Sequence, residues 1–376
     1  MPAPEQIAAP LFVAVGNPDV RLYALDARTR TERVARKAGL EVAAHPAAGR
    51  PLVLADLHFA WDPAWLGQIK RRPGSALMLD GRPVLVHLPD GAEAEAVAAV
   101  MRGERPFEAR SLELLDARTA EVNYHELRKR DRPFVMPLTA DNSIEVERAL
   151  YNAAYKGVTD VLTLYLWRRP AFHLTRWAAQ LGLSPNMVTL VGFVFCVAAF
   201  WLFWVGHYWA GFASGFVFMV LDTVDEKLAR CTGTSSKWGN IFDHGVDLIH
   251  PPFWWWAWAH GLEASGRPLE PVYLSMVVAA IVAGYVLQRV IEGVFVRRFG
   301  MHIHVWRPID SRFRLITARR NPNMVILFVA LLFGRPDVGI ELVALWTLLS
   351  LIFHAVRLAQ ATARADRGRK IISWLS

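Results

Sequence analysis

Apolar positions follow two different patterns along this chain, and the pattern changes near residue 140. Before that point they form short runs, "LFVAV", "PLVLADL", "ALMLDG" and "PVLVHL", bounded by turn residues, as is typical of β-strands. The intervening stretches "ARTRTERVARKAGL" and "EAEAVAAVMRGE" are rich in helix-forming residues. This alternation predicts a small α/β domain over residues 1–140.

From Met187 onward the apolar runs lengthen to about the 20 residues that a membrane-spanning helix needs. We place six such segments near 187–205, 208–228, 240–260, 270–296, 322–335 and 338–358. Residues 141–186 interleave leucines and aromatics with arginines, which predicts helices at the membrane interface with Trp167 and Trp177 at headgroup level. The predicted fold class is an all-α six-helix transmembrane bundle, residues 187–376, preceded by a small cytoplasmic α/β domain.

Positive charge is concentrated on alternate connections between these six segments. The connections after the first, third and fifth segments contain Arg267 and Arg335 as their cations, whereas those after the second and fourth are rich in arginine and lysine. The positive-inside rule then places both termini in the cytoplasm, and we expect an integral protein of a bacterial inner membrane. The N-terminal stretch has no basic segment followed by a long apolar run, so no cleaved signal peptide is expected.

Composition narrows the classes of partner. Hydrophobic residues make up 53% of the chain and charged residues 20%, which suits a soluble part joined to a membrane part. The net charge is 42 − 34 = +8, and the basic residues cluster beside the apolar segments. Membrane lipids or phosphate ligands explain this excess, so no nucleic-acid partner is expected. Two isolated cysteines support neither a disulfide framework nor a cysteine metal site.

Four carboxylates interrupt the apolar pattern in "LDTVDEKLARCTGTSSKWGNIFDHGVDLIH", at the predicted cytoplasmic ends of the second and third segments. They are Asp222, Asp225, Asp243 and Asp247. Spacings of three and four place each pair on one helix face, and a short turn lets the two faces meet. One charged residue at the bilayer centre costs roughly 2.5–3.5 kcal/mol, so cations must compensate. Hard oxygen ligands favour Mg²⁺, Mn²⁺ or Ca²⁺ over zinc, and two divalent ions would neutralise the site.

The carboxylates alone leave several functions open. A two-metal site is typical of phosphoryl transfer, but a Mg²⁺-dependent membrane prenyltransferase also uses aspartate-rich motifs, and a non-catalytic ion transporter can use buried aspartates. A further interpretation is that the four aspartates lie at helix ends and are simply solvated by cytoplasmic water. Prenyl diphosphate turnover would favour the prenyltransferase, and metal-dependent flux without release of CMP would favour the transporter.

The spacing of these residues resembles the signature D-x2-D-G-x2-A-R-x8-G-x3-D-x3-D of the CDP-alcohol phosphotransferase family. The matching residues are Asp222, Asp225, Ala229, Arg230, Gly239, Asp243 and Asp247. "LSPNMVT" is similar to the stretch that opens the family's first membrane helix, and the resemblance covers about residues 150–360. It implies six membrane helices, a homodimer, and a metal-dependent site that transfers a phospho-alcohol from a CDP-alcohol to a hydroxyl with release of CMP.

The resemblance also implies roles for individual residues. Asp222, Asp225 and Asp243 would bind Mg²⁺ or Mn²⁺, with Asp247 as a ligand of the second ion and candidate base, while Asp222, Ala229, Arg230 and Gly239 would contact the donor. "FDHGVD" is similar to choline and ethanolamine phosphotransferases, in which the residue matching His244 is a candidate base. We therefore expect transfer from a polar CDP-alcohol to a lipid hydroxyl, such as diacylglycerol.

The sequence leaves three features open, and it predicts one further ion pair. Glu226 stands where the family has glycine, and its side chain could swing away, add a metal ligand or mark reduced activity. Residues 1–140 resemble a nucleotidyltransferase-like domain but lack its Gly-rich basic loop, which predicts an inactive scaffold, docking or sensing domain. Arg289 and Glu292 are expected to pair within a helix. An arginine-rich loop would contact either anionic lipids or substrate phosphates, including those of a polar acceptor; its arginines are Arg307, Arg312, Arg314, Arg319 and Arg320.

Overall fold

The computed structural model describes the chain apart from residues 1–9, 48, 109–111, 125–128 and 235–236. The side chains of residues 123–124, 129–131, 237–238, 240 and 242–244 also lie outside the description. The chain forms two compact units. Unit 1 comprises Met1–Tyr155, Arg176–Gly182 and Lys227–Thr234, and unit 2 comprises Lys156–Thr175, Leu183–Glu226 and Ser235–Ser376.

Unit 1 contains a six-stranded sheet in the order β4-β1-β5-β8-β7-β9. Its strands are β1 (Leu11–Val15), β4 (Glu41–Val42), β5 (Leu52–Asp56), β7 (Ser75–Leu79), β8 (Arg82–Leu88) and β9 (Glu113–Asp116). β1 is parallel to β4 and β5, β8 is antiparallel to β5 and β7, and β9 is parallel to β7. β1, β5, β7 and β8 correspond to the four short apolar runs, which confirms the predicted α/β region.

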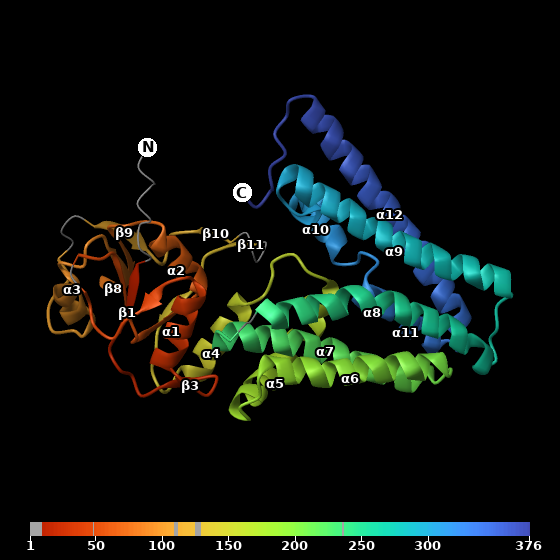
Figure 1. Ribbon diagram of the computed structural model, residues 1–376, viewed down its shortest axis with the longest axis horizontal. Helices are drawn as coiled ribbons and strands as arrows, with labels where there is room; N and C mark the ends of the chain where they lie inside the picture. Colours follow the sequence, from red (N-terminus) through yellow and green to blue (C-terminus); the bar gives the residue numbers. More distant parts are fainter. Residues whose placement is uncertain (1–9, 48, 109–111, 125–128, 235–236) are drawn as a thin grey trace. The chain divides into compact units, whose positions relative to one another are not determined.

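Helices cover both faces of this sheet (Figure 1). Val34 of α1 (Ala27–Lys37) and Trp65 of α2 (Pro63–Lys70) share a hydrophobic cluster with Phe12 of β1. Met101 of α3 (Ala94–Met101) lies in a second cluster with Val13 of β1. Adjacent residues of a strand point to opposite faces, so the two clusters lie on opposite sides of the sheet. This two-sided coverage explains why every residue of β1 is buried.

Short strands complete unit 1. They are β2 (Arg21–Leu22), β3 (Leu25–Asp26), β6 (Phe59–Trp61), β10 (Val122–Tyr124), β11 (Lys129–Asp131) and β12 (Val135–Pro137). They pair in antiparallel twos, β2 with β3, β6 with β12 and β10 with β11. Strands of two or three residues are too short to show an apolar alternation, so the sequence pattern did not indicate them.

A buried polar network joins the sheet region of unit 1 to its helical segments. Glu147 of α4 (Ser143–Ala153) accepts hydrogen bonds from the Tyr23 backbone N–H at 2.7 Å and from Arg176 Nε at 2.6 Å. Arg176 lies on α5 (Arg168–Gln180). Arg30 of α1, itself buried, donates from Nε to the Cys231 carbonyl at 2.9 Å, in the last turn of α7 (Tyr208–Thr232). The α/β region is therefore tied to the carboxyl end of α7.

Replacing Glu147 with alanine should destabilise unit 1. The substitution leaves the buried Tyr23 N–H without its acceptor, which costs about 1–3 kcal/mol, and it removes the partner of Arg176. We expect the thermal unfolding midpoint of the purified protein, followed by tryptophan fluorescence, to fall by several degrees. Glu145→Ala is the matched control, because Glu145 lies on the same helix and is exposed. Equal midpoints for the two variants would contradict the assigned role.

Unit 2 is helical, and six of its helices coincide with the six apolar segments of the sequence. They are α6 (Pro185–Trp204), α7, α8 (Lys237–Ala264), α9 (Pro271–Phe299), α11 (Arg320–Leu332) and α12 (Pro336–Asp366). Among the described residues, three helices are long and apolar enough to cross a membrane, namely α6, α9 and α12, and α11 is a shorter apolar helix. These spans support a membrane protein, while the number of six spans stays a prediction.

The helix ends of unit 2 follow local sequence signals. Ser184 caps α6 by accepting a hydrogen bond from the Met187 N–H, and Pro185 occupies the first turn, where the lack of an N–H has no cost. Gly300 terminates the carboxyl end of α9 with φ of 69°, a left-handed conformation that glycine adopts readily. The "LSPNMVT" motif thus begins α6 at a defined residue.

The predicted interfacial region is only partly exposed. Tyr165, in the π-helical turn η2 (Leu162–Leu166), is 71% exposed and Trp177 of α5 is 58% exposed, which suits contact with lipid headgroups. Trp167 is 1% exposed, and its ring packs edge-on against Phe216 with centroids 5.5 Å apart. The expectation that Trp167 faces the headgroups was therefore wrong, because this ring belongs to the core of unit 2.

Candidate active site

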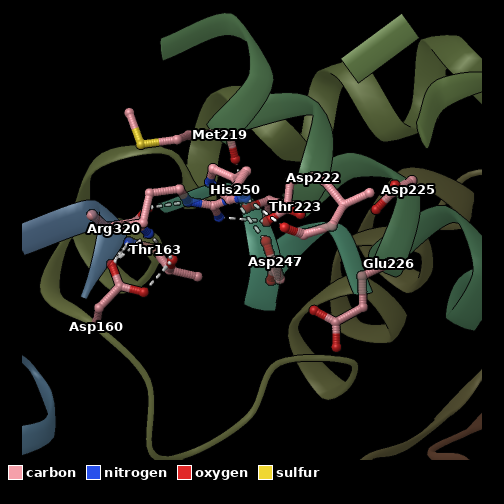
Figure 2. Close-up of polar contacts among 12 residues, drawn as sticks. Asp160, Thr163, Met219, Asp222, Thr223, Asp225, Glu226, Asp247, His250 and Arg320 are labelled. Atoms are coloured by element: carbon pink, nitrogen blue, oxygen red, sulfur yellow. Dashed lines mark hydrogen bonds and ion pairs between the residues drawn. The ribbon is translucent and has the colours of Figure 1, made fainter. Parts of the chain in front are cut away.

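Two of the predicted aspartates meet at a single arginine. Asp222 lies on α7 and Asp247 on α8. Arg320, at the start of α11, donates from Nη2 to Asp222 Oδ2 at 2.7 Å and from Nη1 to Asp247 Oδ1 at 2.8 Å (Figure 2). One guanidinium therefore bridges the carboxylates of two helices, which places Asp222 and Asp247 at one site, as their spacing along the sequence predicted.

Asp225 belongs to the same helix, one turn beyond Asp222. Asp225 is 4% exposed, and its Oδ2 accepts a hydrogen bond from the Thr189 hydroxyl of α6. Thr189 closes the "LSPNMVT" stretch, so the motif that begins α6 also supplies a partner for the second aspartate. A role for Thr189 at the site was not predicted, although its place in the motif was a usable signal.

The remaining residues of the signature are placed less completely. Asp243 and His244 lie in α8, but their side chains are outside the described residues. Ala229 lies on α7 and Gly239 in the first turn of α8. The roles predicted for these four residues stay predictions.

Arg320 is held from several directions, which fixes the bridge. Its side chain is 11% exposed, its Nε donates to Asn321 Oδ1 at 3.0 Å, and its guanidinium carbon lies 4.9 Å from the centre of the Phe218 ring. Asn321 in turn donates from Nδ2 to Asp160 Oδ1 at 3.0 Å. These contacts are built from residues distant in sequence, and the bridging role of Arg320 was not predicted.

Asp160 supports this arrangement as a buried anion. Burial alone would raise the pKa of Asp160, but nearby Arg314 and the hydrogen bonds from Asn321 and Thr163 lower it below its usual range. A carboxylate with a lowered pKa stays ionised at neutral pH. Asp160 therefore presents a fixed acceptor to Asn321, the residue that follows Arg320.

Glu226, the departure from the family pattern, has a partner of its own. Its carboxylate lies 3.0 Å from Lys156 Nζ, and Figure 2 shows it apart from the carboxylates of Asp222 and Asp225. Of the three outcomes left open on the sequence, this geometry favours a side chain that swings away from the aspartates. The observed ion pair gives no support to Glu226 as a metal ligand.

We expect Glu226→Gln to leave the divalent-ion dependence of the protein unchanged. The substitution weakens the ion pair with Lys156 but removes no oxygen from the group formed by Asp222, Asp225 and Asp247. The affinity for Mn²⁺, measured by electron paramagnetic resonance of the free ion, should stay within about twofold of the wild-type value, well under the 1.4 kcal/mol of a tenfold change. A tenfold weaker affinity would identify Glu226 as a ligand.

Two cations of the α7 motif are held within unit 1. Lys227 Nζ donates to the Ala154 carbonyl at 3.2 Å and lies 4.2 Å from the centre of the Tyr155 ring. Arg230 Nη1 donates to the same Ala154 carbonyl at 3.0 Å. The carboxyl end of α4 thus positions the arginine of the family signature, whose contact with donor phosphates stays a prediction.

A second polar cluster lies in unit 2 around Glu292 of α9. Arg289 donates to Glu292 Oε1 at 2.8 Å, which confirms the predicted pair. Arg319 Nη2 lies 2.7 Å from both Glu292 oxygens and 3.2 Å from His304 Nε2. Burial holds the pKa of His304 well below its usual range, and its Nε2 also lies 3.2 Å from Glu292 Oε1.

The Glu292 cluster includes a set of possible metal ligands. Glu292, His304 and His354 have ligand atoms within 4.8 Å of one another, a spacing that could hold a metal ion. The guanidinium groups of Arg289 and Arg319 already outnumber the single carboxylate of Glu292, so a further cation there would be repelled. The cluster therefore fits an ion-pair network that anchors the start of α11 better than it fits a metal.

The aspartate site fits a divalent cation more closely. Asp222, Asp225 and Asp247 carry three negative charges and Arg320 one positive charge, so these four described residues sum to −3 + 1 = −2. Carboxylate oxygens are the ligands that Mg²⁺ and Mn²⁺ prefer. The Asp247 side chain is 45% exposed, so an ion in solvent can reach the group. One divalent ion would neutralise it.

Comparison with known proteins identifies the family of this part of the chain. A model of the CDP-alcohol phosphatidyltransferase family matches residues 182–369. The chain is similar to archaetidylinositol phosphate synthase of Pyrococcus horikoshii, with 25% identity over 205 residues that cover 54% of this chain and 95% of the relative. It is also similar to choline/ethanolaminephosphotransferase 1 of Arabidopsis thaliana, with 33% identity over 112 residues, 27% of this chain and 29% of the relative.

A further relative is an uncharacterised CDP-alcohol phosphatidyltransferase class-I family protein of Schizosaccharomyces pombe, 32% identical over 117 residues, 28% of this chain and 30% of the relative. The chain thus spans less than a third of the length of these two eukaryotic relatives. The family model covers half of the chain and includes all of α7 and α8 together with Arg320. The chain belongs to the CDP-alcohol phosphatidyltransferase family, as its aspartate signature predicted.

Proposed function

We propose that this protein is a CDP-alcohol phosphotransferase, which moves a phospho-alcohol from a CDP-alcohol to a hydroxyl acceptor and releases CMP in the synthesis of phospholipid or sphingolipid head groups. The observation that carries the proposal is the meeting of Asp222 and Asp247 at one guanidinium, within the part of the chain that matches the family. Two similar proteins, an archaetidylinositol phosphate synthase and a choline/ethanolaminephosphotransferase, are consistent with it.

The reaction balances as a single displacement at phosphorus. The acceptor oxygen forms a bond to the phosphorus that carries the alcohol, and the bond from that phosphorus to the bridging oxygen of CMP breaks. The hydroxyl proton passes to a base, for which we propose Asp247 or His244. The half-exposed Asp247 side chain is accessible to a substrate hydroxyl, which a base must approach to hydrogen-bond distance.

Members of this family are generally metal-dependent. We assign two Mg²⁺ or Mn²⁺ ions to Asp222, Asp225, Asp243 and Asp247, and such ions supply charge stabilisation to a transferring phosphoryl group. Arg230 is assigned to the donor phosphates, since a guanidinium matches phosphate oxygens in a bidentate way. Ala229 and Gly239 are small residues whose positions suit a close approach of the nucleotide.

We further propose the setting in which the enzyme works. The six helices of unit 2 would all span the membrane, with α7 and α8 beside α6, α9 and α12. The alternation of cationic connections places both termini and the aspartates in the cytoplasm. The bacterial inner membrane stays a prediction, since the similar proteins include archaeal and eukaryotic ones. The homodimer also stays a prediction.

The α/β region is proposed as an inactive scaffold, with residues 1–140 as the domain, 141–186 as interfacial helices and 187–376 as the transferase domain. Gly16 follows β1 with φ of 91°, and a Cβ there would lie 2.7 Å from the His58 ring. His58 Nδ1 lies 2.9 Å from Asp56 Oδ1. A histidine ring therefore packs where a phosphate-binding loop would need open backbone N–H groups, which supports the loss of nucleotidyl transfer.

The experiment that tests the function is CMP release by the purified full-length protein in lipid nanodiscs. One set of reactions supplies CDP-diacylglycerol with glycerol phosphate, inositol phosphate or serine, and the other supplies polar CDP-alcohols with diacylglycerol or ceramide. CMP release in either set supports the proposal. Turnover of a prenyl diphosphate, or metal-dependent ion flux, without CMP release in either set would overturn it.

A further inference from the structure

Arg320 occupies the same carboxylate oxygens that a divalent ion would need. Its two Nη atoms lie 2.7 Å from Asp222 Oδ2 and 2.8 Å from Asp247 Oδ1. A divalent ion bound by Asp222 and Asp247 would be held by the negative charge of the same two carboxylates. The guanidinium and the ion would therefore compete for these two side chains.

The bridge also answers an electrostatic need. The side chain of Asp222 is 16% exposed and that of Arg320 is 11% exposed, so their charges are little screened by water. Without a cation, the carboxylates of Asp222 and Asp247 would repel each other across α7 and α8. Arg320 neutralises one of these charges and holds both side chains toward a common point, which keeps the site assembled when no divalent ion is bound.

The start of α11 is held by the neighbours of Arg320 on both sides. Arg319 is paired with Glu292 on one side, and Asn321 is bonded to Asp160 on the other. Arg319, Arg320 and Asn321 thus have separate partners, and Arg320, in the middle, faces the aspartates. The helix end stays fixed, so only the Arg320 side chain has to move when its bond to the aspartates is broken.

We propose that Arg320 is the resident counter-cation of the site and competes with the divalent ion for Asp222 and Asp247. Binding of the ion displaces the guanidinium from these oxygens, and loss of the ion restores the bridge. The inference rests on the proposed function in one respect, namely that these aspartates bind a divalent ion. Arg320 is a positioning residue in this scheme, because it acts on the ligands of the ion.

The test compares Mn²⁺ affinity among variants of the purified full-length protein. Arg320→Met removes the competitor, so we expect Mn²⁺ to bind about tenfold more tightly, equivalent to about 1.4 kcal/mol. In EDTA the same variant should unfold at a lower temperature than the wild type, and Mn²⁺ should raise its unfolding midpoint by a larger margin. Arg320→Lys keeps the charge but cannot bridge two carboxylates as a planar fork, so its affinity should be intermediate.

Arg312→Met is the matched control, because Arg312 lies in the same arginine-rich stretch, within α10 (Pro308–Arg314), and is exposed. Its Mn²⁺ affinity should stay within about twofold of the wild type, since solvent screens an exposed charge. Unchanged or weaker Mn²⁺ binding by folded Arg320→Met overturns the competition, and if that variant does not fold, wild-type affinity in Arg320→Lys overturns it. Absence of Mn²⁺ binding in every protein would instead contradict the metal site of the proposed function.

Discussion

Replacing Asp222 with asparagine should lower the rate of CMP release by on the order of 10³-fold, or about 4 kcal/mol. An asparagine has nearly the same shape but carries no charge, so it loses both the ion pair with Arg320 and the anionic ligand for a divalent ion. Asp222 is largely buried and is bonded to Arg320, so the loss of its charge should be strongly damaging. Asp225→Asn and Asp243→Asn should have similar effects on activity.

Removal of the metal should give the same loss in the unmodified protein. EDTA should abolish CMP release, and Mg²⁺ or Mn²⁺ should restore it. For the Asp222→Asn substitution, the matched control is Asp366→Asn. Asp366 pairs with Arg298 on the surface and its side chain is 60% exposed. Its activity should be within about twofold of the wild type, as expected for an exposed ion pair. Full activity of Asp222→Asn in metal-free buffer would remove the two-metal hypothesis.

Helix positions were predictable because they depend on local pattern. Apolar runs of membrane length produced segments that overlap α6, α7, α8, α9, α11 and α12, although α12 ends at Asp366, beyond the predicted residue 358. The shared face of Asp222 and Asp225 follows from helix periodicity. In unit 1 the same logic found β1, β5, β7 and β8, whose residues are buried on both faces. It could not give the sheet order, because the parallel pairing of β7 with β9 joins segments far apart in sequence.

The site was predictable only for residues that carry a motif. Arg320 is 98 residues from Asp222 and 73 residues from Asp247, and it had been grouped with its neighbours in an arginine-rich loop. The structure separates these arginines by partner, with Arg319 on Glu292 and Arg320 on the aspartates. No periodicity or spacing distinguishes two adjacent arginines that point to different carboxylates, so this division needed the tertiary structure.

This division bears on the direction of transfer. A polar, phosphorylated acceptor would need free arginines near the aspartates, yet Arg319 is engaged with both oxygens of Glu292. Fewer guanidinium groups then remain for a second phosphate. A neutral lipid hydroxyl brings no charge to the site and needs a base close to the aspartates. The balance therefore favours a polar CDP-alcohol as the donor and diacylglycerol or a ceramide-like alcohol as the acceptor.

His244→Ala should lower CMP release by roughly 10²–10⁴-fold with a polar CDP-alcohol and a lipid acceptor, the usual contribution of a general base. His244 follows Asp243 on α8, so a base at this position would act next to the proposed metal ligands. His260→Ala is the control, because His260 lies on the same helix with an exposed ring stacked on Trp204, and it should leave the rate nearly unchanged. The two substrate sets described above decide the direction. CMP release only with CDP-diacylglycerol would reverse the assignment of donor and acceptor, and His244→Ala should then have little effect, because a different group would take the proton of the polar acceptor.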